Sequence, residues 1–263
     1  MGTKVDIFGA ALLDFMNDEY TEDIVVHSSI AEDDVIPVPY LFRDFKEMPL
    51  LEQKALELSK GKILDIGSGA GSHSLWLQEQ GLDVTGLDIS EGAVTLSRKR
   101  GLKNSIHEAI LDHKGTYDTL LLLMNGTGIF EKVQKIDSYL KHLKSLLSPE
   151  GQILIDGSDI VYMFEDEDGG FWVDTHRDYY GEVTYSMSYK GVQGDTFDWL
   201  YLDYAKLEWY AKKNELKCEL IFEGADDDAD QVVWDGTYRG QPVQTGTYTY
   251  KFIVWPNNYN GGE

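Results

Sequence analysis

Short apolar runs alternate with helical segments between residues 62 and 222 of the 263-residue chain. In the segment 133–147, apolar residues recur at helical spacing, whereas the apolar runs beside it are only long enough for strands. This alternation predicts an α/β fold with a doubly wound, mostly parallel sheet and crossover helices. The predicted strands are residues 63–66, 83–87, 105–110, 119–124, 152–155 and 216–222.

Three regions depart from this pattern and suggest the domain organisation. Residues 1–60 have mixed helical and extended character, and we expect them to cover the ligand site of a central domain at 61–224. Residues 157–201 are dense in aromatic residues and carboxylates, and they leave the sheet after its fifth strand. Residues 225–263 change to Gly, Thr, Tyr and Trp, which indicates a separate β-rich tail with a hairpin.

A glycine-rich turn follows the first predicted strand. It reads Asp-Ile-Gly-Ser-Gly-Ala-Gly over residues 65–71, and such a turn lets the backbone and a helix N-terminus approach a ligand. The dinucleotide fingerprint, counted from Gly67, would require Gly or Ala at position 72, which is Ser72. Asp88 ends the second strand, where its carboxylate can accept hydrogen bonds from both ribose hydroxyls. The pattern therefore indicates a cofactor that contains a nucleoside, and its spacing disfavours NAD.

These motifs resemble those of class I S-adenosylmethionine-dependent methyltransferases over residues 40–224. The segment 147–155, Leu-Ser-Pro-Glu-Gly-Gln-Ile-Leu-Ile, adds to the resemblance, with Glu150 in place of a usual glycine. The resemblance implies a Rossmann-like fold and S-adenosylmethionine as cofactor, with Asp65 near its amino group and Asp88 at its ribose. The cofactor-binding residues that it implies are Asp65, Gly67, Ser68, Gly69, Gly71, Asp88, Ile89, Ala109, Ile110, Met124 and Asn125.

Some of these positions also have a purely structural interpretation. Gly69 and Gly71 could serve packing, Asp88 could cap the next helix, and Asn125 could belong to an ordinary turn. The family often has an acidic residue where this chain has Ala109, so adenine would be recognised through the backbone there. Alternative functions are an aminopropyl transferase, an NAD-linked oxidoreductase, or a non-catalytic or exported binding module.

The aromatic segment 157–201 is the predicted acceptor lid. Alternation in 182–189 and 197–202 predicts a hairpin over the active site, and aromatic rings with carboxylates could hold a cationic small molecule. A solvated acidic loop over packed aromatics is the alternative. Methyl transfer depends mainly on alignment of donor and acceptor, so the catalytic candidates are only Asn125 and His176. No spacing of His, Asp or Glu suggests a metal site.

Charge and cysteine content indicate which kinds of partner and which cellular compartment the protein is expected to have. The formal net charge of −23 argues against nucleic acid, because a polyanion repels phosphate backbones. No apolar run approaches the ~20 residues that span a membrane, and the first residues do not resemble a signal peptide. The single cysteine, Cys218, lies in an apolar stretch, which predicts a buried thiol in a reducing cytoplasm.

The tail resembles a second family. The pattern Trp-Asp-Gly-x-Tyr-x-Gly at 234–240, followed by Gly-x-Tyr-x-Tyr at 246–250, is similar to the end of the gliding-motility-associated C-terminal domain, a secretion-sorting module. Only the final strands of that domain are present, and so small a fragment cannot bury a core of its own. We therefore predict that residues 247–255 pair antiparallel with 216–222 as a seventh strand of the enzyme sheet.

Overall fold

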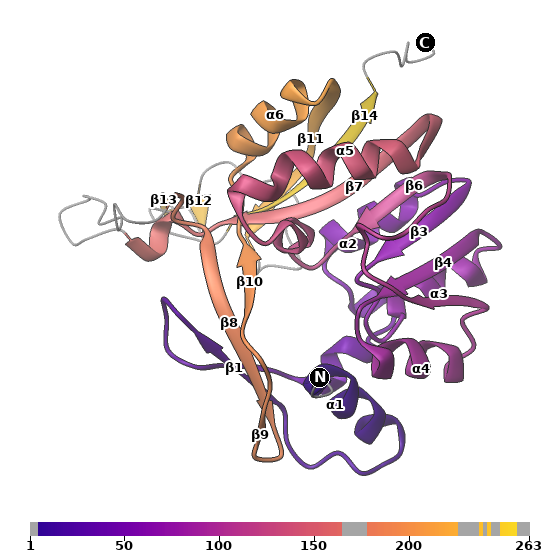
Figure 1. Cartoon of the computed structure of the whole chain (residues 1–263), viewed down its shortest axis with the longest axis vertical. Helices are drawn as coiled ribbons and strands as arrows, with labels where there is room; N and C mark the ends of the chain where they lie inside the picture. The colour runs from indigo at the N-terminus through magenta and orange to yellow at the C-terminus, as the bar shows by residue number, and fades with distance from the viewer. Residues whose placement is uncertain (1–4, 165–177, 226–236, 239–240, 243–247, 257–263) are drawn as a thin grey trace.

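A seven-stranded sheet forms the centre of the computed structural model, which describes residues 5–164, 178–225, 237–238, 241–242 and 248–256. Its strands are β3 (Lys62–Ile66), β4 (Asp83–Asp88), β5 (Asn104–His107), β6 (Tyr117–Leu122), β7 (Leu147–Asp159), β11 (Leu216–Ala225) and β14 (Tyr248–Pro256). They lie in the order β11-β14-β7-β6-β3-β4-β5, and Figure 1 labels all of them except β5. The strands from β3 to β7 are mutually parallel, and β14 is antiparallel to both of its neighbours. The predicted doubly wound α/β fold is confirmed.

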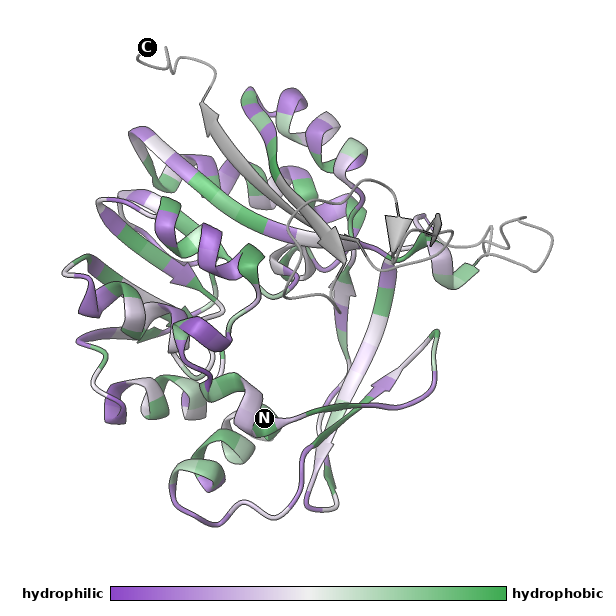
Figure 2. Ribbon diagram, turned by 180° about the vertical axis from the view of Figure 1, so that it is seen from behind, coloured by the Kyte–Doolittle hydropathy of each residue, from purple (hydrophilic) through white to green (hydrophobic). Residues whose placement is uncertain are grey.

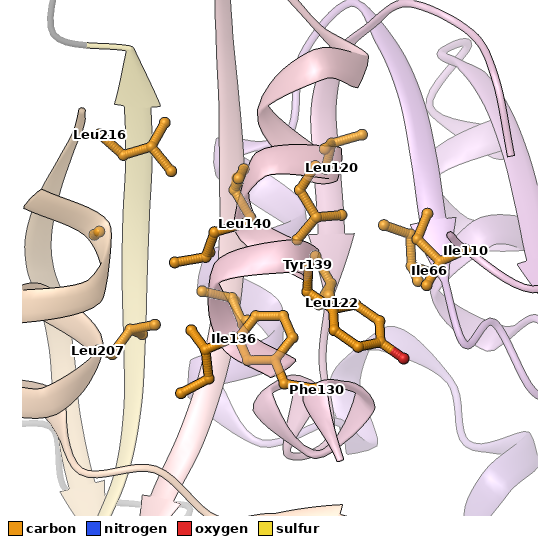
Figure 3. Packing of buried hydrophobic residues seen from close by; sticks show 14 of the residues in the cluster. Ile66, Ile110, Leu120, Leu122, Phe130, Ile136, Tyr139, Leu140, Leu207 and Leu216 are labelled. Carbon is orange, nitrogen blue, oxygen red and sulfur yellow. The ribbon is translucent and has the colours of Figure 1, made fainter. Parts of the chain in front are cut away.

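Helices cover both faces of this sheet. They are α2 (Leu50–Leu58), α3 (Ser72–Glu79), α4 (Glu91–Lys99), α5 (Ile136–Leu146) and α6 (Tyr204–Lys213), with 3₁₀ turns η1 (Val38–Phe42), η2 (Phe45–Glu47), η3 (Gly126–Phe130), η4 (Val133–Lys135) and η5 (Val161–Phe164). On one face, Ile136 and Leu140 of α5 pack toward Leu122 of β6 (Figure 3). On the other face, Leu56 and Leu77 pack with Leu154. Each such buried side chain contributes about 1.5–3 kcal/mol, and in Figure 2 the central strands are mostly hydrophobic along their length.

Local sequence determines where several helices begin. Ser90 accepts a hydrogen bond from the Ala93 amide and caps α4. Asp203 caps α6 in the same way by accepting from the Lys206 amide. Arg98 lies in the last turn of α4, where its charge complements the helix dipole.

Three strand boundaries differ from the prediction. Strand β7 begins earlier than predicted, at Leu147, with a register shift against β6 before Gln152, and it extends to Asp159 because β14 pairs with its second half. Strand β5 ends at His107, since the chain turns where the Asp112 amide donates to the Ala109 carbonyl. Strand β6 ends before Met124, which has a left-handed φ of 63°.

A second sheet joins the N-terminal segment to the insertion after β7. It contains β1 (Ile24–Ser28), β2 (Asp34–Ile36), β8 (Glu182–Tyr189), β9 (Val192–Gln193) and β10 (Phe197–Leu200), in the order β10-β8-β1-β2 with β9 on β8. The predicted hairpin is present, because β8 and β10 pair antiparallel. The pairing of β1 with β8 was not predicted, and it makes the N-terminal segment part of the same sheet. We call these five strands the lid sheet.

Helix α1 (Ile7–Met16) packs directly on α4 (Figure 1). A Cβ atom at Gly9 would lie 2.6 Å from the Gly92 Cα, and one at Gly92 would lie 2.5 Å from the Gly9 Cα. The two backbones can therefore approach this closely only because both residues are glycine. The Asp6 carboxylate accepts hydrogen bonds from the Gly9 amide (2.9 Å), the Gly92 amide (2.9 Å) and the Ser90 hydroxyl (2.8 Å), so one side chain caps both helices.

The tail contributes a strand to the main sheet. Strand β14 lies between β7 and β11 and pairs with both, which confirms the predicted antiparallel partner of 216–222. A short pair, β12 (Thr237–Tyr238) with β13 (Gln241–Pro242), precedes it.

Candidate functional site

The 67–71 turn, at the carboxyl end of β3, has a conformation that requires its glycines. Gly67, Gly69 and Gly71 have φ values of 76°, 51° and 82°, which L side chains rarely adopt. Gly71 also has a packing role, because a Cβ atom there would lie 3.1 Å from the Ser97 side chain. The Ser68 hydroxyl is buried in this turn without a hydrogen-bond partner, which leaves one polar atom that a ligand could satisfy.

Asp88 connects this turn to the start of α4. One carboxylate oxygen accepts from the Gly69 amide at 2.8 Å, and the other accepts from the Ser90 amide at 2.8 Å. Burial raises the pKa of Asp88. Since Ser90 is the helix cap, Asp88 is not the N-cap that the alternative interpretation proposed. Each oxygen keeps a lone pair, so acceptance from ribose hydroxyls remains chemically open to it. The neighbouring Ile89 is 72% exposed beside it.

Asp65 lies beside a buried ionic network. Its carboxylate accepts from the Ser74 hydroxyl at 2.6 Å, and burial raises its pKa. Glu52 of α2 bonds both His73 (2.7 Å) and Arg43 (2.6 Å). Burial opposes the charged forms of Glu52 and His73, but their mutual attraction outweighs it, so the pKa of Glu52 is lowered and that of His73 is raised.

No local pattern in the sequence indicated this network, because Arg43 and Glu52 come from the segment before the first core strand. His73 lies in the first turn of α3, which begins directly after the glycine turn, so the network anchors the chain where it leaves this turn.

The carboxyl end of β6 continues into a second left-handed turn. Met124 and Asn125 have φ values of 63° and 60°. Asp156 accepts from the Met124 amide (3.0 Å) and from the Gly126 amide (2.7 Å), and the Ser158 hydroxyl donates to the Asn125 side-chain oxygen (2.6 Å). Asn125 therefore belongs to a turn that the Asp156 and Ser158 side chains stabilise through hydrogen bonds. Met124, at the edge of this turn, is 40% exposed.

The predicted adenine region follows β5. Ala109 is exposed, whereas Ile110 is 6% exposed and belongs to the main core. The Glu108 amide donates to the Asp88 carbonyl at 3.1 Å, which holds this segment against the end of β4. The Glu108 side chain bonds His113 at 2.8 Å, and it is 37% exposed. Contact of Ala109 or Ile110 with adenine stays a prediction.

One face of the lid sheet is turned toward these turns. The strand registers place twelve side chains on that face, which we call the lid face: Ile24, Val26, Ser28, Asp34, Ile36, Val183, Tyr185, Met187, Tyr189, Val192, Phe197 and Trp199. The Trp199 ring lies so close to Gly128 of η3 that a Cβ atom there would be 1.9 Å from it. Ile36 and Met187 pack against the cluster that contains Ala70 of the glycine turn. The lid face is therefore largely aromatic and apolar, and none of its side chains is basic.

Some predicted features lie outside the described residues. His176 and the acidic run at 165–168 belong to this part of the chain. Within 5–164, 178–225 and the described strands of the tail, no group of three or more His, Cys, Asp or Glu residues could hold a metal ion. No helix in the same residues is long and apolar enough to cross a membrane.

Comparisons with known proteins point to one family. The family model described as "Methyltransferase domain" matches residues 40–189. A crystal structure of an S-adenosylmethionine-dependent methyltransferase from Bacteroides fragilis, in complex with S-adenosyl-L-homocysteine, is 39% identical with a TM-score of 0.81, and the match covers 96% of this chain and 97% of that one. The CcbJ methyltransferase from Streptomyces caelestis is 15% identical with a TM-score of 0.56 over 78% of this chain and 89% of its own, which shows the fold alone.

The curated relatives match shorter segments. The putative methyltransferase YqeM of Bacillus subtilis is 28% identical over 105 residues, so the match spans 37% of this chain and only 42% of that protein. The ribosomal RNA small subunit methyltransferase C of Alcanivorax borkumensis is 41% identical over 51 residues, which is 19% of this chain and 16% of that protein.

Proposed function

The chain belongs to the methyltransferase-domain family, and on this premise we propose that it transfers a methyl group from S-adenosylmethionine to a small-molecule acceptor. The observation that carries the proposal is the pairing of the left-handed 67–71 turn with Asp88, at the carboxyl edge of the sheet. The similarity to the Bacteroides fragilis methyltransferase over nearly its whole length supports it further.

Named residues would hold the cofactor. Asp65 would accept from its amino group, the 67–71 turn would face its carboxylate end, and Asp88 would accept from its ribose hydroxyls. Ile89, Ala109 and Ile110 would border its adenine, and Met124 with Asn125 would border the reacting end. S-adenosylmethionine supplies a methyl group activated by a sulfonium. The chain's own task is then to hold donor and acceptor in line, for which no dedicated base is required.

The lid face is the proposed wall of the acceptor site. Aromatic rings favour flat or cationic ligands, and the one charged side chain on the lid face is the carboxylate of Asp34. The Tyr185 hydroxyl of the lid face lies 3.0 Å from the Tyr201 hydroxyl, and the two could form hydrogen bonds with an acceptor. We therefore propose a neutral or cationic small molecule as acceptor. The net charge of −23 disfavours nucleic acid, although some relatives that match short segments are ribosomal RNA methyltransferases.

Calorimetry against S-adenosylhomocysteine and NAD tests the cofactor assignment. S-adenosylhomocysteine is expected to bind, and NAD is not, because Ser72 stands where the dinucleotide fingerprint needs Gly or Ala. Equal or tighter binding of NAD would overturn the assignment in favour of an oxidoreductase of the same fold.

An acceptor screen with methyl-labelled S-adenosylmethionine tests the substrate class. Transfer is expected to small amines or neutral aromatic compounds, and a Tyr185→Phe variant should raise the KM of the acceptor severalfold without changing S-adenosylhomocysteine affinity. Thr184→Ala is the matched control, since Thr184 lies on the opposite face of β8 and bonds Asp198 there. Methylation of nucleic acids or other polyanions alone would refute the proposed class.

Two finer assignments accompany this function. We place the protein in the cytoplasm, because its one cysteine, Cys218, is buried and cannot form an internal disulfide. We assign the tail a structural role in the enzyme sheet rather than secretion sorting, on the basis of the β14 pairing.

A further inference from the structure

Asp156 is a buried carboxylate that the cofactor assignment does not use. It follows the run of core residues in β7 and is 2% exposed, on the sheet face that carries Leu154 and α2. Both of its oxygens are engaged by one short segment, through the Met124 amide at 3.0 Å and the Gly126 amide at 2.7 Å. The carboxylate therefore holds the 124–126 turn in place from the interior of the protein.

The backbone conformation of this turn is unfavourable and needs stabilising hydrogen bonds. Met124 and Asn125 are consecutive residues with left-handed backbones, a combination that L side chains rarely adopt. Gly126 cannot be replaced by a larger residue to stiffen the turn, because a Cβ atom there would lie 2.6 Å from the Leu122 Cβ. The amides point inward to Asp156, while the Met124 side chain remains 40% exposed.

We propose that Asp156 is a positioning residue of the cofactor site, whose carboxylate fixes the 124–126 turn so that Met124 and Asn125 border the reacting end. The inference rests on the proposed function, since it takes the carboxyl edge of β6 as part of the S-adenosylmethionine site. Ser158 assists it by donating to the Asn125 side chain at 2.6 Å.

The charge of Asp156 makes this role dependent on pH. Burial, with a smaller contribution from the Glu52 charge, raises the pKa of Asp156 to about 7, against the lowering effect of the hydrogen bonds from the turn amides. Glu52, which is bound to Arg43 and His73, faces it from α2, and Lys251 is its partner in the register with β14. Because a carboxylate accepts amide hydrogen bonds more strongly than a neutral acid, the turn is held more firmly above this pKa.

The same titration has the opposite sign for global stability. A folded-state pKa above the unfolded value means that the stabilisation from Asp156 is complete below about pH 4 and is lost as the pH rises through about 7. Ligand affinity and unfolding free energy should therefore change in opposite directions over this interval. A merely structural carboxylate would affect only the second quantity.

The test is an Asp156→Asn variant, with S-adenosylhomocysteine as the probe. An amide keeps the shape but turns an NH₂ group toward one of the two turn amides. Wild-type affinity is expected to rise severalfold between about pH 6 and pH 8, and the variant should bind at least tenfold more weakly at the higher pH, without this rise. Hydrogen exchange in residues 123–130 should be faster in the ligand-free variant.

Two further variants make the result decisive. Asp118→Asn is the matched control, because Asp118 accepts from the Lys62 amide (2.8 Å) and the Ser148 hydroxyl (2.7 Å) at the opposite edge of the sheet, so its ligand affinity should be unchanged. Ser158→Ala removes the hydroxyl that bonds the Asn125 side chain. If Asp156→Asn fails to fold, a smaller loss of affinity in Ser158→Ala supports the inference in its place. If Asp156→Asn and Ser158→Ala both keep the affinity and the pH dependence of the wild type, the inference about Asp156 is wrong, while the proposed function is unaffected. Wild-type protein that does not bind S-adenosylhomocysteine would overturn the proposed function itself.

Discussion

Truncation after Glu223 is expected to yield a protein that is largely insoluble and lacks a cooperative thermal transition. It removes β14, which pairs with β11 from Leu216 to Ala225 and with β7 from Ile153 to Asp159. Two long strands would then face a gap of about two strand spacings, roughly 10 Å, with unpaired edges that favour aggregation. The expected loss is comparable to the whole free energy of unfolding of a typical domain, about 5–15 kcal/mol.

Soluble yield and thermal unfolding measure this effect. Truncation after Pro256 is the matched control, because it removes only residues beyond β14, and the protein should keep its thermal midpoint and its affinity for S-adenosylhomocysteine. A Glu223 truncation that is as soluble, as stable and as able to bind the ligand would show that the tail is an appendage.

Asp88→Ala is expected to reduce S-adenosylhomocysteine affinity at least tenfold. The variant loses a charged acceptor for two ribose hydroxyls, each worth roughly 1.5–3 kcal/mol. It also releases the Gly69 and Ser90 amides, so the ligand-free protein should lose about 1–3 kcal/mol of stability. Calorimetry at a temperature well below both thermal midpoints separates the two effects.

Asp83→Ala provides the control for this experiment. Asp83 begins the same strand at its opposite, exposed end, so its replacement should leave ligand affinity unchanged. Asp88→Ala protein with wild-type affinity would show that the carboxylate serves only to join the glycine turn to α4.

The sequence predicted the features that are encoded locally. Helix α5 was visible from the apolar spacing of residues such as Ile136 and Leu140, which the structure buries against the sheet. The glycine turn was visible because a left-handed backbone needs glycine, and the structure gives Gly67, Gly69 and Gly71 positive φ values. The seventh strand was inferred because the tail is too small to bury a core of its own, and the structure confirms the pairing.

What the sequence missed depends on contacts between distant segments. Val25 pairs with Ser188 across the lid sheet, and no local periodicity reports such a partner. The bond of Glu52 to His73 likewise depends on how α2 packs against α3. Asp156 could have been noticed, because it follows an apolar strand just as Asp65 and Asp88 occur at strand ends. That the strand continues past Asp156 could not be predicted, because this part of β7 is paired by β14 from the distant tail.

The lid face is built mostly from residues outside the segment that defines the family. The methyltransferase-domain match ends at residue 189 and begins at residue 40, so it includes β8 but neither β1 and β2 nor β10. On the proposed function, most side chains that would contact the acceptor therefore lie outside the matched segment. Substitutions in β1, β2 and β10 are then expected to change which compound is methylated while leaving the affinity for S-adenosylhomocysteine unchanged.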